Sequence, residues 1–108
     1  MGVRKIFCFM LFWGYTNYMD ISYSASKSEM NIARRDLSFE SASLFDMSGA
    51  LIIEDTRQEY SEHRFQALGF IGDRLHMLVF TPRDDKVHVI SLRKANPREV
   101  QRYEQAID

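Results

Sequence analysis

The stretch His88–Glu99, HVISLRKANPRE, carries the clearest fold signal in the chain, because a strand pattern runs directly into a helix start. Over residues 88–93 successive side chains alternate between two faces, as they do in a strand. Asn96 is a favoured helix-capping residue, Pro97 suits the first helical position, and Glu99 completes a capping box. We therefore predict a strand that ends near Arg93 and a final helix that begins at Pro97.

Two adjacent cations, Arg93 and Lys94, lie at this join, and Arg98 follows just beyond it. A helix N-terminus carries about half a positive charge and free amides, so cations beside it are unfavourable unless an anion compensates them. A bound phosphate is one such anion. The carboxylates of the acidic segment over residues 54–62 are the other possible anions, and they would form salt bridges with these cations. Charge spacing alone slightly favours such salt bridges.

Outward from this stretch, the sequence predicts three consecutive strands, Arg64–Phe70, Arg74–Thr81 and Lys86–Arg93. Gly72-Asp73 reads as a two-residue hairpin turn and Pro82–Asp85 as a second turn, so an antiparallel meander is the simplest arrangement. Regular alternation predicts two faces for the third strand: Val87, Val89 and Ser91 on one, His88, Ile90 and Leu92 on the other.

The first half of the chain predicts a short strand, Asp20–Tyr23, followed by a helix that ends near Arg35. Either Ser24 or Ser26 can cap this helix, and Ser26 with Glu29 matches a capping box. A short helix capped by Ser38, a strand over 50–53 and an acidic loop over 54–62 follow. Helices beside an antiparallel sheet predict an α+β fold.

Composition bounds the classes of protein to consider. The 108 residues suffice for one domain, and 45% hydrophobic with 27% charged residues is ordinary for a globular protein. A net charge of -1 argues against a surface coated with nucleic-acid-binding cations, although cations and acids are segregated along the chain. The single cysteine, Cys8, allows no disulfide within the chain and suits the cytoplasm, and the three scattered histidines give no zinc spacing.

Residues 1–18 differ from the rest. Arg4 and Lys5 precede an apolar run, Ile6–Trp13, that resembles the start of a signal peptide. No small-residue cleavage site follows, and the run is shorter than the roughly 20 residues that span a bilayer. We predict a poorly ordered extension, or sequence upstream of the true start at Met19.

From Met19 onward, about ninety residues resemble the BrnT family, toxins of a bacterial type II toxin–antitoxin system. The resemblance rests on motifs that occur in the same order: Lys27-Ser28-Glu29-Met30-Asn31, Leu37-Ser38-Phe39-Glu40, Asp55-Thr56-Arg57 with Tyr60, Glu62-His63-Arg64-Phe65, Leu68-Gly69, Val79-Phe80-Thr81, Val89-Ile90-Ser91-Leu92-Arg93-Lys94-Ala95, Glu99 and Tyr103. The chain departs from the family pattern at Ser24, usually Asp, at Arg34-Arg35-Asp36, often Lys-His-Gly, and at His88, often Arg.

The resemblance implies a compact RelE-like α+β fold over residues 19–108, with helices packed on an antiparallel sheet. It implies an endoribonuclease that blocks translation by cutting RNA in the cytoplasm. The chemistry expected of such an enzyme fits without a metal or another cofactor. The resemblance also implies a partner, a BrnA-like antitoxin with a ribbon-helix-helix part. That antitoxin would inhibit the toxin, and operator DNA would be bound only through the complex.

RNA cleavage by the neighbouring 2′-hydroxyl requires proton transfer and stabilisation of extra charge on phosphorus. Arginine suits the second task because its guanidinium binds two phosphate oxygens at once. The predicted catalytic residues are Arg64, Arg93, Glu62 and Tyr103, and the predicted RNA-binding residues are Lys27, His88, Lys94 and Arg98. His63 is a further acid–base candidate.

Structural roles remain open for several of these residues. Glu62 and Arg64 can pair with each other, Tyr103 lies on the apolar stripe of the last helix, and His63 and His88 can be solvated. The same cations also suit a non-catalytic module that binds an antitoxin or DNA, or an inactive relic of a toxin.

Overall fold

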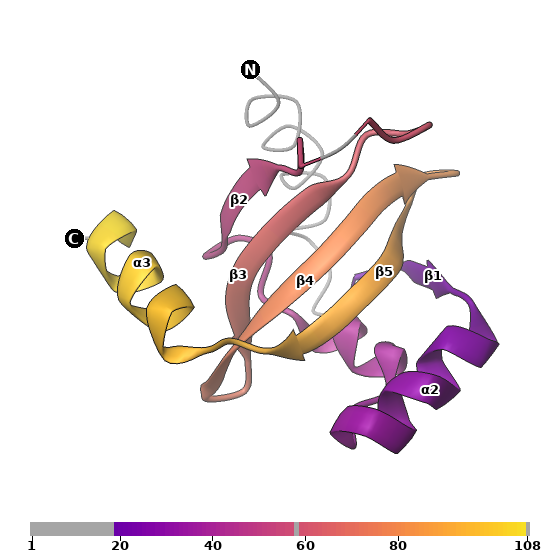
Figure 1. Cartoon of the computed structure of the whole chain (residues 1–108), viewed down its shortest axis with the longest axis horizontal. Coiled ribbons are helices and arrows are strands. Elements are labelled where there is room, and N and C mark those ends of the chain that lie inside the picture. Colours follow the sequence, from indigo (N-terminus) through magenta and orange to yellow (C-terminus); the bar gives the residue numbers. More distant parts are fainter. Residues whose placement is uncertain (1–18, 58, 108) are drawn as a thin grey trace.

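Five strands form one sheet in the order β1-β5-β4-β3-β2, and helical segments pack on both of its faces (Figure 1). The computed structural model describes residues 19–57 and 59–107, so the extension predicted over residues 1–18 lies outside it. The elements, in chain order, are β1 (Ile21–Tyr23), α2 (Ala25–Arg35), the 3-10 helix η1 (Phe39–Leu44), β2 (Leu51–Glu54), β3 (Phe65–Ile71), β4 (Arg74–Arg83), β5 (Lys86–Lys94) and α3 (Pro97–Ile107). The α+β class is confirmed. The specific likeness to RelE stays a prediction.

The antiparallel meander β3-β4-β5 is confirmed, and two tight turns set its register. Gly72 begins the first turn with φ +63°, a conformation that glycine adopts without steric cost. Asp84 and Asp85 form the second turn with φ 53° and 61°, which aspartate tolerates better than most residues. The second turn therefore has two residues, and β4 continues through Pro82 to Arg83.

A β-bulge corrects the predicted faces of β5. Ser91 pairs with Val79 and Val89 pairs with Phe80, so Ile90 is an extra residue without a partner on β4. One extra residue shifts the alternation, because each residue beyond it changes face. Leu92 consequently joins Val87 and Val89 in the main core, and Ser91 does not.

The two faces of the sheet carry separate cores. The main core, the larger of the two, packs η1 residues such as Phe39 and Ala42 against Leu78 and Phe80 of β4. The smaller one lies under α3, where Tyr103 packs with Leu68, Leu75, Met77 and Ala95. These contacts lie near the α3 end of the sheet, and in Figure 1 no helix crosses the foreground of β4 and β5. The part of the α3 side of the sheet that no helix covers is called the open face below.

Helix α2 is fixed to the sheet by polar contacts. Ser24 is its N-cap and accepts a hydrogen bond from the Lys27 amide, so the capping box predicted at Ser26 is wrong and the alternative, Ser24, is right. The Asn31 side chain donates to the carbonyl oxygens of Leu37 and Leu92 at 2.8 and 2.9 Å. The buried amide of Asn31 thereby holds α2 against β5.

None of the helices in the described ranges combines the length and the apolarity needed to cross a membrane.

Candidate functional site

Charged and polar side chains gather on the open face where β4 turns into β5. Thr81 pairs with His88 across the hairpin, and Arg83 pairs with Lys86. Strand residues two apart share a face, so Arg83 and Thr81 point the same way. His88 points that way too, because directly paired residues lie on the same side of a sheet. The hairpin therefore sets an arginine beside a histidine at its solvent-facing end.

Glu62 completes this cluster from the loop before β3. Its Oε1 accepts a hydrogen bond from Nη2 of Arg83, and both side chains remain partly exposed. The Arg83 contact is the main reason that the pKa of Glu62 is lowered, and the charges of His88 and Arg64 lower it further. Glu62 is therefore a carboxylate at neutral pH, and it holds the Arg83 guanidinium over the sheet.

His88 is held by strand β1. The parallel pairing of β1 with β5 sets Ser22 opposite His88, and the Ser22 hydroxyl lies 2.9 Å from Nδ1 of the imidazole. Burial is the main cause of the lowered pKa of His88, and the cations Arg83 and Lys27 lower it further while Glu62 opposes them. The imidazole is thus neutral near pH 7. In the tautomer whose Nδ1–H donates to the Ser22 hydroxyl, Nε2 carries a lone pair that can accept a proton.

Arg64 reaches the same end of the sheet from a loop that Asp55 fastens. The Asp55 side chain is fully buried and accepts from Nε and Nη2 of Arg57 at 2.8 and 2.7 Å. These bonds hold the pKa of Asp55 at about 2, although burial opposes them. In the same loop the Arg64 guanidinium stacks 4.0 Å from the centre of the Tyr60 ring. The loop lines a hollow of about 410 Å³ with Glu62 and Arg64 on its wall.

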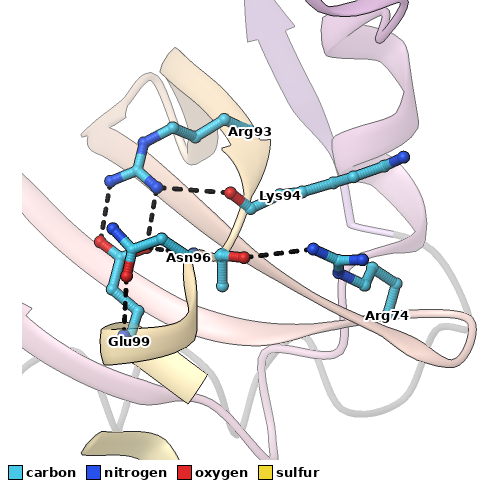
Figure 2. Close-up of polar contacts among 6 residues, drawn as sticks. Arg74, Arg93, Lys94, Asn96 and Glu99 are labelled. Atoms are coloured by element: carbon cyan, nitrogen blue, oxygen red, sulfur yellow. Dashed lines mark hydrogen bonds and ion pairs between the residues drawn. The ribbon is translucent and has the colours of Figure 1, made fainter. Parts of the chain in front are cut away.

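The adjacent cations Arg93 and Lys94 lie at the other end of β5, just before α3. An acidic residue of α3 compensates the charge of Arg93 there (Figure 2). Nη1 and Nη2 of Arg93 donate to the two carboxylate oxygens of Glu99 at 2.7 and 2.8 Å. Glu99 also accepts from the amide of Asn96, whose side chain accepts from the Glu99 amide in return. Glu99 is therefore the anion at the helix start. The Lys94 side chain points away from it.

The structure divides the predicted site residues into two groups. Glu62, Arg64, His88 and Lys27 come together at the β4–β5 end, whereas Arg93, Lys94, Arg98 and Tyr103 lie toward α3. Phe65 pairs with Phe80 and Arg93 with Met77, so Arg64 and Arg93 lie on the order of 15 Å apart by strand spacings. The Tyr103 hydroxyl donates to the carbonyl oxygen of Gly49 at 2.8 Å, and its ring is buried.

Two residues of the cluster, Arg83 and Ser22, are absent from the candidates that the sequence predicts. Pro82 reads as part of a turn, because proline interrupts most strands. If the predicted turn had been limited to Asp84-Asp85, Arg83 would have been the last residue of the preceding strand. Strand alternation would then have predicted its side chain on the same face as that of His88. Ser22 carries no such signal, since its place beside His88 depends on a parallel pairing between segments 66 residues apart.

Within residues 19–57 and 59–107, no group of three histidine, cysteine or acidic side chains is arranged to hold a metal ion. A family model described as "Ribonuclease toxin, BrnT, of type II toxin-antitoxin system" matches residues 23–99. The matched range includes the charged and titratable residues gathered at the β4–β5 end, which are Lys27, Glu62, Arg64, Arg83 and His88. Searches of curated proteins and of solved structures found no match.

Proposed function

The chain belongs to the BrnT family of ribonuclease toxins of type II toxin–antitoxin systems, and we propose that it cuts RNA at the β4–β5 end of the open face. The proposed reacting centre consists of His88, Arg83, Arg64, Glu62 and Lys27. The observation that carries this assignment is the meeting of a neutral, Ser22-held imidazole with a Glu62-held, partly exposed guanidinium on one side of the sheet.

The proposed reaction is attack by a 2′-hydroxyl on the adjacent phosphorus. Nε2 of His88 takes the hydroxyl proton while the 2′-oxygen–phosphorus bond forms. The phosphorus–5′-oxygen bond breaks on the opposite side, and the leaving oxygen takes a proton from the Lys27 ammonium. The products are a cyclic 2′,3′-phosphate and a free 5′-hydroxyl. No water molecule is consumed, so atoms and charge balance within the RNA and the two side chains.

The arginines supply the electrostatic part of the mechanism. The phosphorus gains negative charge at the transition state, and fixed guanidinium groups stabilise that charge more than the charge of the ground state. Arg83 is pre-positioned by Glu62, and Arg64 is pre-positioned by stacking on Tyr60. These two cations perform the charge-stabilising role that a metal ion performs in other nucleases, which supports a metal-independent reaction.

Arg93 and Tyr103, also predicted to be catalytic, are left out of this proposed centre. The guanidinium of Arg93 is already engaged by both oxygens of Glu99, and the Tyr103 hydroxyl by the Gly49 carbonyl. Reaching the phosphate would require breaking these contacts and, for Tyr103, exposing a ring that is 7% accessible. Both side chains stabilise the α3 end of the fold, and they act on the reaction only through that stability.

A type II system pairs its toxin with a protein antitoxin, and we propose an antitoxin of the BrnA-like, ribbon-helix-helix class. An acidic segment of that antitoxin would cover the cations of the open face, because this both blocks RNA and neutralises their charge. Operator DNA would then be bound through the antitoxin alone. The proposed place of action is the cytoplasm, where the toxin inhibits translation by cutting RNA.

The decisive experiment incubates purified protein with single-stranded RNA in excess EDTA and identifies the ends of the fragments. Fragments that end in a cyclic 2′,3′-phosphate and begin with a 5′-hydroxyl are expected. An RNA of the same sequence with 2′-O-methyl groups throughout should stay intact. Intact wild-type substrate with tight antitoxin binding would instead identify a non-catalytic partner. Cleavage abolished by EDTA and restored by a divalent ion would refute the metal-independent mechanism.

A further inference from the structure

A groove of about 170 Å³ runs between α2 and β5, next to the proposed reacting centre. Three cations line it, Lys27, Arg34 and Arg35, together with Met30, Ile90 and Ser91. The two acidic residues of this region, Glu29 and Asp36, do not line it. We propose that this groove, called the α2–β5 groove, binds the RNA strand as it leaves the cleavage site, an inference that rests on the proposed function.

The spacing of the cations fits a chain of phosphates better than a single anion. Lys27 and Arg34 are seven residues apart, so they lie on one side of α2, separated by two turns or about 10 Å of helix axis. A single phosphate group is too small to contact both ends of such a stripe. Consecutive phosphates of a strand laid along α2 can contact both.

The groove is continuous with the reacting centre through two of its residues. Lys27 is close enough to His88 for its charge to lower the histidine pKa. Ser91 follows the bulge at Ile90 and, like His88, lies outside the main core. A strand whose reactive phosphate lies at His88 therefore passes directly into the groove, and Lys27 contacts the strand where the two regions meet.

The floor of the groove is an open strand edge. β1 pairs with β5 only from Val87 to Val89, so on that side no strand of the described ranges pairs with Ile90 or Ser91. At the next residue, the side-chain amide of Asn31 donates a hydrogen bond to the carbonyl oxygen of Leu92. Between Val89 and Leu92 this open edge is two residues long, which is shorter than the strands that usually add to a sheet. It is long enough to offer backbone groups to one nucleotide.

The walls of the groove predict weak sequence preference. Met30, which is 51% exposed, and Ile90 offer apolar surface to a base, and no exposed aromatic ring lines the groove. Grooves that bind single strands without reading sequence combine cations with such base-contacting surface. The groove should therefore add affinity for RNA of any sequence, while Arg83, Arg64 and His88 determine the rate.

The test measures binding of a short single-stranded RNA, fully 2′-O-methylated so that it cannot be cut, to wild type and to the double variant Arg34→Ala/Arg35→Ala. Binding should weaken about tenfold at low salt, because the variant can no longer pair these two cations with phosphates. The slope of log affinity against log salt should become shallower by about 0.7 for each phosphate that the variant no longer neutralises. The single-turnover cleavage rate at saturating RNA should stay within about twofold of wild type, because the reacting centre is unchanged. Arg102→Ala on α3, which removes a cation outside the groove, is the control and should bind like wild type.

Each outcome decides something different. If the double variant keeps the RNA affinity, the salt dependence and the cleavage rate of wild type, the proposed role of the α2–β5 groove is wrong and the proposed function stands. Loss of affinity in the double variant of a protein that never cuts RNA would support the groove and refute the reaction. If the double variant keeps RNA affinity but loses an acidic peptide that wild type binds, the groove serves a protein partner and the proposal is wrong. A thermal melt of each variant shows whether the fold is intact.

Discussion

Arg93 at the end of β5 holds both carboxylate oxygens of Glu99, the residue that closes the N-terminal capping box of α3, at 2.7 and 2.8 Å. The pair is mutually stabilising, since Glu99 raises the pKa of Arg93 and Arg93 lowers that of Glu99. A cation beside a helix N-terminus is thus compensated by an acid of the helix itself. The pair links the last strand to the last helix, and it does so at the C-terminal end of β5, whereas His88 lies near the start of that strand.

Removing this pair should affect stability more than cleavage. Arg93→Ala leaves a Glu99 carboxylate that is 12% exposed without its cation, so a loss of about 1–2 kcal/mol in unfolding free energy is expected. That loss corresponds to a melting temperature lower by roughly 5–10 °C for a domain of this size. Cleavage by the folded fraction should remain within a few-fold of wild type. If Arg93→Ala cleaved RNA a hundredfold more slowly with an unchanged melting temperature, Arg93 would belong to the reacting centre after all.

The arginines of the β4–β5 end should behave in the opposite way. Arg83→Ala and Arg64→Ala should each slow single-turnover cleavage by about 100-fold, the usual effect of removing one charge-stabilising contact. Binding of 2′-O-methylated RNA should change much less, because these groups meet their full charge only at the transition state. Arg102→Ala is the control for simple loss of a cation. Equal losses of rate and affinity in both variants would show that they only bind the substrate.

The pH dependence of cleavage should report His88. The proposed base must be unprotonated, so kcat/KM should rise with pH and level off above the pKa of the free enzyme. Burial lowers that pKa, so the midpoint should lie below the usual value of 6.5. His88→Asn should slow cleavage strongly and remove the acidic limb. Ser22→Ala should keep the limb with a smaller loss of rate, since Ser22 only orients the imidazole. An acidic limb that survives in His88→Asn belongs to another base.

Asp55 should make the fold acid-sensitive. Its pKa is about 2 in the folded state against 3.8 ordinarily, so its stabilising effect is complete above pH 4 and is lost as pH falls toward 2. Asp55→Asn should therefore cost about 1–2 kcal/mol at neutral pH, a figure reduced because its partner Arg57 is 68% exposed. The variant should also lose less stability than wild type between pH 4 and pH 2. Urea unfolding at several pH values measures both effects, and parallel stability curves for the two proteins would contradict the assignment.

A shortened chain that starts at Met19 should fold and cleave RNA like the full chain. Met19 is buried in the main core, and its backbone amide donates to the carbonyl oxygen of Ser43 at 3.0 Å, so the shortened chain keeps both contacts. The family match likewise starts downstream, at residue 23. Thermal melts and cleavage rates of the two chains provide the comparison. A large drop in melting temperature on shortening would mean that the apolar run Ile6–Trp13 contributes to stability.

The elements that depend on local interactions could be predicted from the amino-acid sequence. The Asn96 cap, Pro97 and the Glu99 box define the start of α3, because capping depends on residues three apart. Gly72-Asp73 defines a turn because glycine adopts positive φ freely. The antiparallel meander follows from strands joined by such short turns. The family motifs consist of neighbouring residues, so they can be recognised in the sequence without a structure. They indicated Glu62, Arg64 and Lys27 as candidate site residues.

Which of these candidate residues lie close together depends on long-range contacts in the folded chain. The bulge at Ile90 reverses the alternation along β5, so the regular alternation assumed from the sequence assigned Ser91 and Leu92 to the wrong faces. The parallel pairing of β1 with β5 joins Ser22 to His88, and such long-range pairing depends on the whole core rather than on nearby residues. Charge pairing is likewise set by distance in space: Arg83 meets Glu62 and Arg93 meets Glu99, while Arg64 and Arg93, equivalent in sequence chemistry, lie at different ends of one sheet.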